Sequence, residues 1–178
     1  MGYELVQILD CETRIAVLFT WNKMGRVFDP RKVESRSWLK EFAQAPATLV
    51  FDDFLRIYFA CRPPRDPQTR QYISYTAYVD VKKDSFLDII GFAEKPVFEL
   101  GAASTFDEFG TYPTSVLRHE GELVAYFGGW TRCSSVAFNV GIGKAYSHDQ
   151  GKTFQKVGKG GPILSYTPDE PFINGHQH

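Results

Sequence analysis

Short apolar runs, separated by turn residues, recur along the chain from residue 46 onward. They occupy 46–50, 54–60, 73–80 and 95–98, and then 113–117, 123–129, 140–147 and 161–164. Runs of about 4–8 residues bounded by Gly, Pro, Asp and Asn are typical of β-strands. Within 35–42, by contrast, Trp38, Leu39 and Phe42 have helical spacing, which predicts one or two helical turns. The rest of the pattern predicts an all-β chain.

The two sets of predicted strands form a repeat. Four pairs of landmarks are offset by 66 to 68 residues: Pro46 and Pro113, Phe59 and Phe127, Ala77 and Ala145, Pro96 and Pro162. We therefore divide the chain into an N-terminal segment (1–42), two repeats (43–105 and 106–168) and the start of a further repeat (169–178). A four-stranded antiparallel sheet that recurs at a fixed period is typical of a β-propeller blade. The predicted fold is a single, partial β-propeller-like domain over 1–178, with two complete blades and the start of a third.

Composition narrows the class of partner. Twenty Lys and Arg residues against 21 Asp and Glu residues give a net charge of −1, which argues against nucleic acid as the main partner. The three cysteines, Cys11, Cys61 and Cys133, are widely and irregularly spaced, so neither a zinc site nor a disulfide framework is indicated. The apolar run at 15–21 is too short for a membrane span, and the first residues lack the basic start of a secretory signal. We expect a cytoplasmic protein with no cofactor and no membrane partner.

The second repeat contains a motif with a structural role. Residues 147–154, Ser-His-Asp-Gln-Gly-Lys-Thr-Phe, fit the pattern S-x-D-x-G-x-T-aromatic that is known as an Asp-box. In such a turn the Asp149 carboxylate caps backbone N–H groups, Gly151 supplies a positive φ, and the aromatic Phe154 packs between strands. We therefore interpret Asp149 as a residue that holds a hairpin.

Several strings, taken together with this turn, resemble a known family. They are 21–30 (WNKMGRVFDP), 43–48 (AQAPAT), 53–62 (DFLRIYFACR), 95–101 (KPVFELG) and 106–116 (FDEFGTYPTSV). The chain resembles, over 21–178, the glycosyl-hydrolase-like five-bladed β-propellers of the arabinanase, β-xylosidase and invertase superfamily, and within it a bacterial branch. Five blades of this period need roughly 330 residues. The resemblance thus implies either that the chain is the N-terminal part of a longer propeller or that several copies assemble through open blade edges.

The resemblance also implies where catalytic carboxylates lie. The family uses three acidic residues from successive blades, at the axial end where the innermost strands begin, and glycoside hydrolysis needs carboxyl groups that face each other across the scissile bond. The positions that match are Asp29, Asp107 and Glu170, each just before a predicted innermost strand. The alternative is ordinary turn chemistry, because Asp commonly caps the turn before a strand.

Sugar-binding residues are expected at the same end. The candidates are Gln44, Arg62, Tyr112, Trp130 and His176. For Arg62 and Trp130, a surface ion pair or core packing is the alternative, and His176 with His178 alternates on one strand face, a pattern that also suits a metal. The sequence therefore predicts a glycosyl-hydrolase-like protein that acts on, or binds, an oligo- or polysaccharide through axial carboxylates. Two alternatives stay open: a non-catalytic carbohydrate-binding protein, and a self-assembling propeller fragment.

Overall fold

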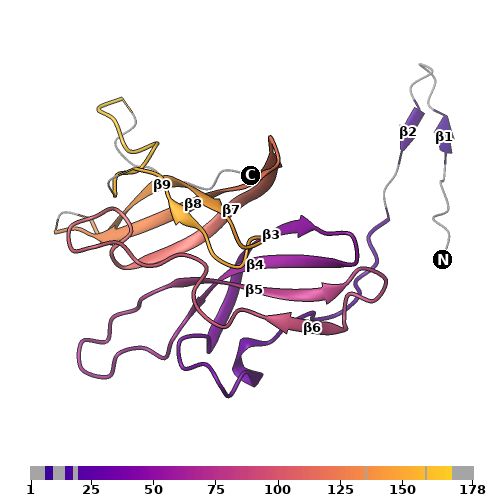
Figure 1. Cartoon of the computed structure of the whole chain (residues 1–178), viewed down its shortest axis with the longest axis horizontal. Helices are drawn as coiled ribbons and strands as arrows, with labels where there is room; N and C mark the ends of the chain where they lie inside the picture. The colour runs from indigo at the N-terminus through magenta and orange to yellow at the C-terminus, as the bar shows by residue number, and fades with distance from the viewer. Residues whose placement is uncertain (1–6, 10–14, 18–19, 135, 159, 170–178) are drawn as a thin grey trace.

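The computed structural model describes residues 7–9, 15–17, 20–134, 136–158 and 160–169. Within these ranges two four-stranded antiparallel sheets form the body of the protein, in the orders β3-β4-β5-β6 and β7-β8-β9-β10 (Figure 1). The first sheet comprises β3 (Glu41–Val50), β4 (Phe54–Arg62), β5 (Tyr75–Lys82) and β6 (Ile89–Phe92). The second comprises β7 (Gly110–His119), β8 (Glu122–Arg132), β9 (Phe138–Ser147) and β10 (Gln155–Lys156). The predicted all-β class, with four-stranded antiparallel sheets, is thereby confirmed.

Two smaller elements precede the sheets. The strands β1 (Gln7–Leu9) and β2 (Ile15–Val17) pair with each other as a separate antiparallel hairpin. A single 3-10 turn, η1 (Pro30–Lys32), follows, with a proline at its start, where the missing N–H costs no hydrogen bond. No helix in the described ranges has the length and apolar character that a membrane span requires.

The helical turns predicted for 35–42 are wrong. The chain makes non-helical turns through this stretch, and β3 already begins at Glu41. The backbone N–H of Lys40 donates to the carbonyl of Arg62 at 3.1 Å, and Glu41 lies opposite Arg62 in the ladder. Pairing with β4 therefore decides the conformation here, whatever the local spacing of apolar residues favours.

The outermost strands also lie elsewhere than predicted. They are β6 and β10, in place of 95–98 and 161–164. Val97 makes a single backbone hydrogen bond to the β5 residue Thr76 (2.8 Å), and Leu164 only a bridge to Ile142 of β9. Val97 and Phe98 are each 1% exposed because this segment passes between the two sheets, so its apolar residues fill the core and do not line an outer edge.

Aromatic rings fill the space between the sheets. Phe98, from the connecting segment, stacks on Phe127 of β8 with ring centroids 4.6 Å apart. The ring centroid of Phe154 lies 5.6 Å from that of Phe98 and 6.0 Å from that of Tyr58 of β4, so both sheets contribute to one cluster. Each such ring removes a large apolar area from water, and the tilted and edge-on pairs add a further gain. This shared core holds the two sheets together.

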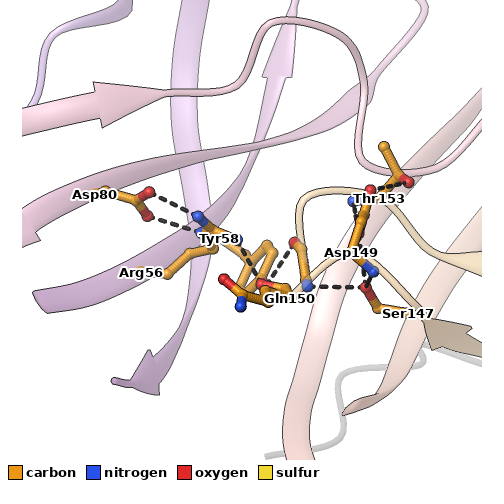
Figure 2. A network of polar contacts seen from close by, with 8 residues as sticks. Arg56, Tyr58, Asp80, Ser147, Asp149, Gln150 and Thr153 are labelled. Carbon is orange, nitrogen blue, oxygen red and sulfur yellow. Dashed lines mark hydrogen bonds and ion pairs between the residues drawn. The ribbon is translucent and has the colours of Figure 1, made fainter. Parts of the chain in front are cut away.

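A polar network strengthens the same contact (Figure 2). Arg56 is 2% exposed, donates to both carboxylate oxygens of Asp80 at 2.7 Å, and also donates to the carbonyl of Gln150 in the second sheet's last turn at 2.8 Å. The Tyr58 hydroxyl donates to the Gly151 carbonyl at 2.8 Å. Burial raises the pKa of Tyr58, so this hydroxyl remains a donor.

The turn at 147–153 is held by its own side chains. The Ser147 hydroxyl accepts from the Gly151 N–H and lies 2.8 Å from Asp149 Oδ1, while Thr153 donates to Asp149 through both its N–H and its hydroxyl. Gly151 has a φ of +79°, and a Cβ there would lie 2.3 Å from the Tyr58 oxygen. Only glycine therefore permits both the turn and its close approach to the first sheet.

Candidate functional site

The starts of β3 and β7 and the ends of β4 and β8 lie at the same end of the molecule. Antiparallel pairing places Glu41 opposite Arg62 in the first sheet and Gly110 opposite Trp130 in the second. The two sheets touch here, since β3 contacts β7 and Ser74 forms a parallel bridge with Gly110. Residues of both sheets that the sequence predicts to bind sugar are thus brought to one end of the molecule.

Arg62, the last residue of β4, lies among aromatic rings. Its guanidinium carbon is 5.1 Å from the ring centre of Phe42 and 4.8 Å from that of Tyr72. The guanidinium of Arg65 lies 4.1 Å from the same Tyr72 ring. Tyr72 therefore gathers two arginines around one aromatic side chain, an arrangement that cation–π attraction stabilises.

Arg132 continues this arrangement from the second sheet. Its guanidinium donates to the Tyr72 carbonyl at 2.7 Å and lies 3.8 Å from the ring centre of Phe109. The Phe109 ring is 6.0 Å from that of Trp130, whose indole N–H donates to the Ser74 hydroxyl at 2.7 Å. We call this group the arginine–aromatic cluster; its members are Phe42, Arg62, Arg65, Tyr72, Phe109, Trp130 and Arg132.

Two predicted binding residues lie on the innermost strands beside the cluster. Gln44 is exposed on β3, between two register shifts, and its neighbours Phe42 and Ala45 have φ values of +64° and +49°. Such angles are uncommon for residues with a side chain, so the strand is locally bent at this point. Tyr112 of β7 packs against Gly128 of β8, and burial raises the pKa of Tyr112 to about 12. Tyr112 is therefore a neutral hydroxyl at physiological pH.

Asp29 is a separate feature of the segment before β3. Its carboxylate caps η1 by accepting from the Arg31 backbone N–H at 3.2 Å. The Arg31 side chain donates to both of its oxygens, and Arg26 donates to Oδ2 at 2.9 Å. These hydrogen bonds, chiefly that from Arg31, hold the pKa of Asp29 well below its usual range. Asp29 is thus a carboxylate that remains ionised, so it is unsuited to the role of general acid and only weakly basic.

Asp107 is buried, with 1% of its side chain exposed. It forms an ion pair with Lys156 of β10, and the Thr105 hydroxyl lies 3.0 Å from its Oδ1. Gly101 and Gly129 leave room for it, because a Cβ at either position would lie within 2.1 to 2.4 Å of Asp107 atoms. These contacts are those of a structural ion pair, and the catalytic role expected for Asp107 stays a prediction.

The remaining predicted residues, Glu170 and His176, lie outside the described residues. Among those described, no group of three or more His, Cys, Asp or Glu side chains is placed to hold a metal ion.

Several members of the cluster were not predicted as site residues from the sequence. Tyr72, Phe109 and Arg132 come from a loop, a turn and a strand end, and no local motif marks them. Of these three residues, only Arg132 could have been identified from its spacing in the sequence. It follows Trp130 by two positions in one strand, which places both side chains on the same face.

Known proteins similar to the chain include two sequence relatives and one solved structure. No protein-family model matches the chain. Two curated proteins of Mycobacterium tuberculosis, Uncharacterized protein MT1551 (strain CDC 1551 / Oshkosh) and Uncharacterized protein Rv1502 (strain ATCC 25618 / H37Rv), are each 28% identical to it over 153 residues. The match covers 85% of the chain and 48% of each relative, so the chain spans about half the length of the curated relatives it matches.

A solved structure extends the comparison to the fold. Zg3597, a family 117 glycoside hydrolase produced by the marine bacterium Zobellia galactanivorans, superposes with a TM-score of 0.56 at 17% sequence identity. The superposition covers 79% of this chain and 38% of that one. The two proteins share a fold.

Proposed function

We propose that the chain is part of a glycoside-hydrolase-like β-propeller and binds carbohydrate at the end where the arginine–aromatic cluster lies. The cluster is the observation that carries this proposal. It combines aromatic faces, on which sugar rings stack, with planar N–H donors that suit sugar hydroxyls, and both sheets contribute to it. The fold shared with a glycoside hydrolase supports the same class of ligand.

A carbohydrate-binding propeller can hydrolyse its ligand or only bind it. The environment of Asp107 favours binding without hydrolysis. A general acid or a nucleophile must reach the scissile bond, whereas Asp107 is 1% exposed and already paired with Lys156. Of the other two expected carboxylates, Asp29 is engaged by Arg26 and Arg31. Binding is therefore the activity we propose for this chain, and hydrolysis is the activity to be tested beside it.

The binding proposal is tested with Phe42→Ala. The Phe42 ring is 44% exposed at the cluster, and Phe86, 41% exposed between β5 and β6, gives a matched control in Phe86→Ala. Loss of a stacking ring is worth about 1 kcal/mol, so the affinity for an oligosaccharide found on a glycan array should fall about fivefold. The control should bind as the unmodified chain does. Equal losses in both variants, or no glycan bound by the unmodified chain, would refute the proposal.

Hydrolysis is tested with Glu170→Gln, which removes one expected carboxyl charge. Release of new reducing ends from the bound glycan is measured for the unmodified chain and for the variant. Turnover that disappears in the variant, with affinity unchanged, identifies an enzyme. Binding without turnover in the unmodified chain identifies a binding protein.

A further inference from the structure

Positive charge is concentrated around the cluster although the whole chain is almost neutral. The chain carries a formal net charge of −1. The loop between β4 and β5 nevertheless contains Arg65 and Arg70 against a single carboxylate, Asp66, and it is flanked by Arg62 and Arg132. Four arginines therefore gather at the ligand-facing end proposed above, where Asp66 of the loop and Glu41, opposite Arg62, are acidic neighbours.

The arginines of the cluster are not neutralised by the described part of the protein. Among the described residues, none of Arg62, Arg65 and Arg132 forms an ion pair with a carboxylate. Asp66, the acid nearest in sequence, uses its Oδ1 to accept from the backbone N–H groups of Gln68 and Thr69. The positive charge at this end is consequently available to a ligand.

Contact with an aromatic ring leaves the N–H donors of a guanidinium free to bind other groups. A guanidinium that lies over an aromatic ring uses its face, while its N–H donors lie in the plane and point outward. Within the described ranges, Arg62 and Arg65 donate no side-chain hydrogen bond to another residue. Both lie within 4.8 Å of the centre of one ring, that of Tyr72, so two guanidinium groups gather around one side chain. The planar fork of each guanidinium matches the geometry of an oxyanion.

From this geometry we propose that the cluster recognises an anionic sugar, with Arg62 and Arg65 binding the carboxylate of a uronic acid or the sulfate of a sugar ester. The inference rests on the proposed function and deepens it by naming the class of carbohydrate. Arg132 adds charge, but two of its donors already bond to Gln71 and Tyr72, so it is a secondary contributor. Phe42 and Trp130 are left to stack on the sugar rings.

The test compares an acidic oligosaccharide with its neutral ester and with a sulfated sugar. Trigalacturonic acid, its neutral methyl ester and a sulfated galacto-oligosaccharide are titrated into the 178-residue chain by calorimetry at low and high salt. A charge-assisted bidentate contact is worth more than a neutral one, so the acid or the sulfated sugar should bind at least tenfold more tightly than the ester. Raised ionic strength should weaken the charged ligand alone, because these side chains are near the surface.

Variants assign the effect to the two arginines. Arg62→Gln and Arg65→Gln should each lower the affinity for the charged ligand about tenfold and the affinity for the neutral ester by a clearly smaller factor. Arg118→Gln is the matched control, since Arg118 also lies near a ring, that of Phe51 (4.9 Å), but at the opposite end of the sheets. Thermal unfolding of each variant shows whether the fold is kept, and the exposed Arg65 can be replaced with little structural risk.

Each outcome decides the inference. A preference for the uronate or for the sulfated sugar supports it and identifies the anion. Equal binding of the acid, its ester and the sulfated sugar overturns it while the proposed carbohydrate binding survives. Binding of none of the glycans overturns both the inference and the proposed carbohydrate binding.

Discussion

Replacing Asp107 by Asn separates a structural carboxylate from a catalytic one. Asn keeps the size and shape of the side chain and removes only the charge. Asp107 is 1% exposed, and its partner Lys156, on the edge strand β10, is 21% exposed. The substitution therefore leaves an ammonium group largely buried without its carboxylate. We expect the main effect to be on folding stability.

The magnitude follows from the burial of the two groups. Removing one partner of a buried ion pair commonly costs about 3–5 kcal/mol. Lys156 retains some exposure and lies 5.6 Å from the ring centre of Phe127, so part of this cost is relieved. We expect Asp107→Asn to lower the free energy of unfolding by about 2–3 kcal/mol. For a domain of this size, that corresponds to a decrease in Tm of about 5–10 °C.

Urea unfolding of four proteins measures the pair directly. The proteins are the unmodified chain, Asp107→Asn, Lys156→Met and the double variant. If the pair is structural, the double variant should be more stable than the two single losses together predict, with a coupling of about 1.5–3 kcal/mol. Unchanged stability of Asp107→Asn, within about 0.5 kcal/mol, combined with lost glycan turnover, would refute the structural interpretation and restore the catalytic one.

Two further predictions concern pH and packing. Arg31 depresses the pKa of Asp29 in the folded chain below its ordinary value of 3.8, so the carboxylate stabilises the fold above that pH and this stability is lost as pH falls through the folded pKa. The Tm difference between the unmodified chain and Asp29→Asn should therefore be constant from pH 7 to about 5 and vanish under strongly acidic conditions. A difference that already closes near pH 6 would contradict this prediction. Gly128→Ala should lower the free energy of unfolding by about 1–3 kcal/mol, because its Cβ would lie 2.0 Å from Tyr112 Cζ, whereas Gly91→Ala, with nothing within 4 Å, should change it by less than about 0.5 kcal/mol in the same denaturation experiment.

Much of the fold was predictable because a strand leaves a local pattern in the sequence. Apolar runs between turn residues located the three inner strands of each sheet, and the repeat indicated that two similar sheets would form. The outer strands were misplaced because the same signal, an apolar run, also marks a buried connection. Val97 and Phe98 are apolar because they lie between the sheets, and nothing in the run itself distinguishes that place from an edge strand.

The sequence by itself determined the all-β class and the local chemistry of the turn at 147–153, where each side chain bonds to a group at most four residues away. Only the tertiary structure decided which distant residues share a site. Lys156 meets Asp107 across 49 residues, and Arg132 meets Tyr72 across 60. Such contacts arise when two sheets pack on a common aromatic core, which brings strand ends and loops to one place. The local sequence pattern does not predict that packing, because the packing depends on how the two sheets meet.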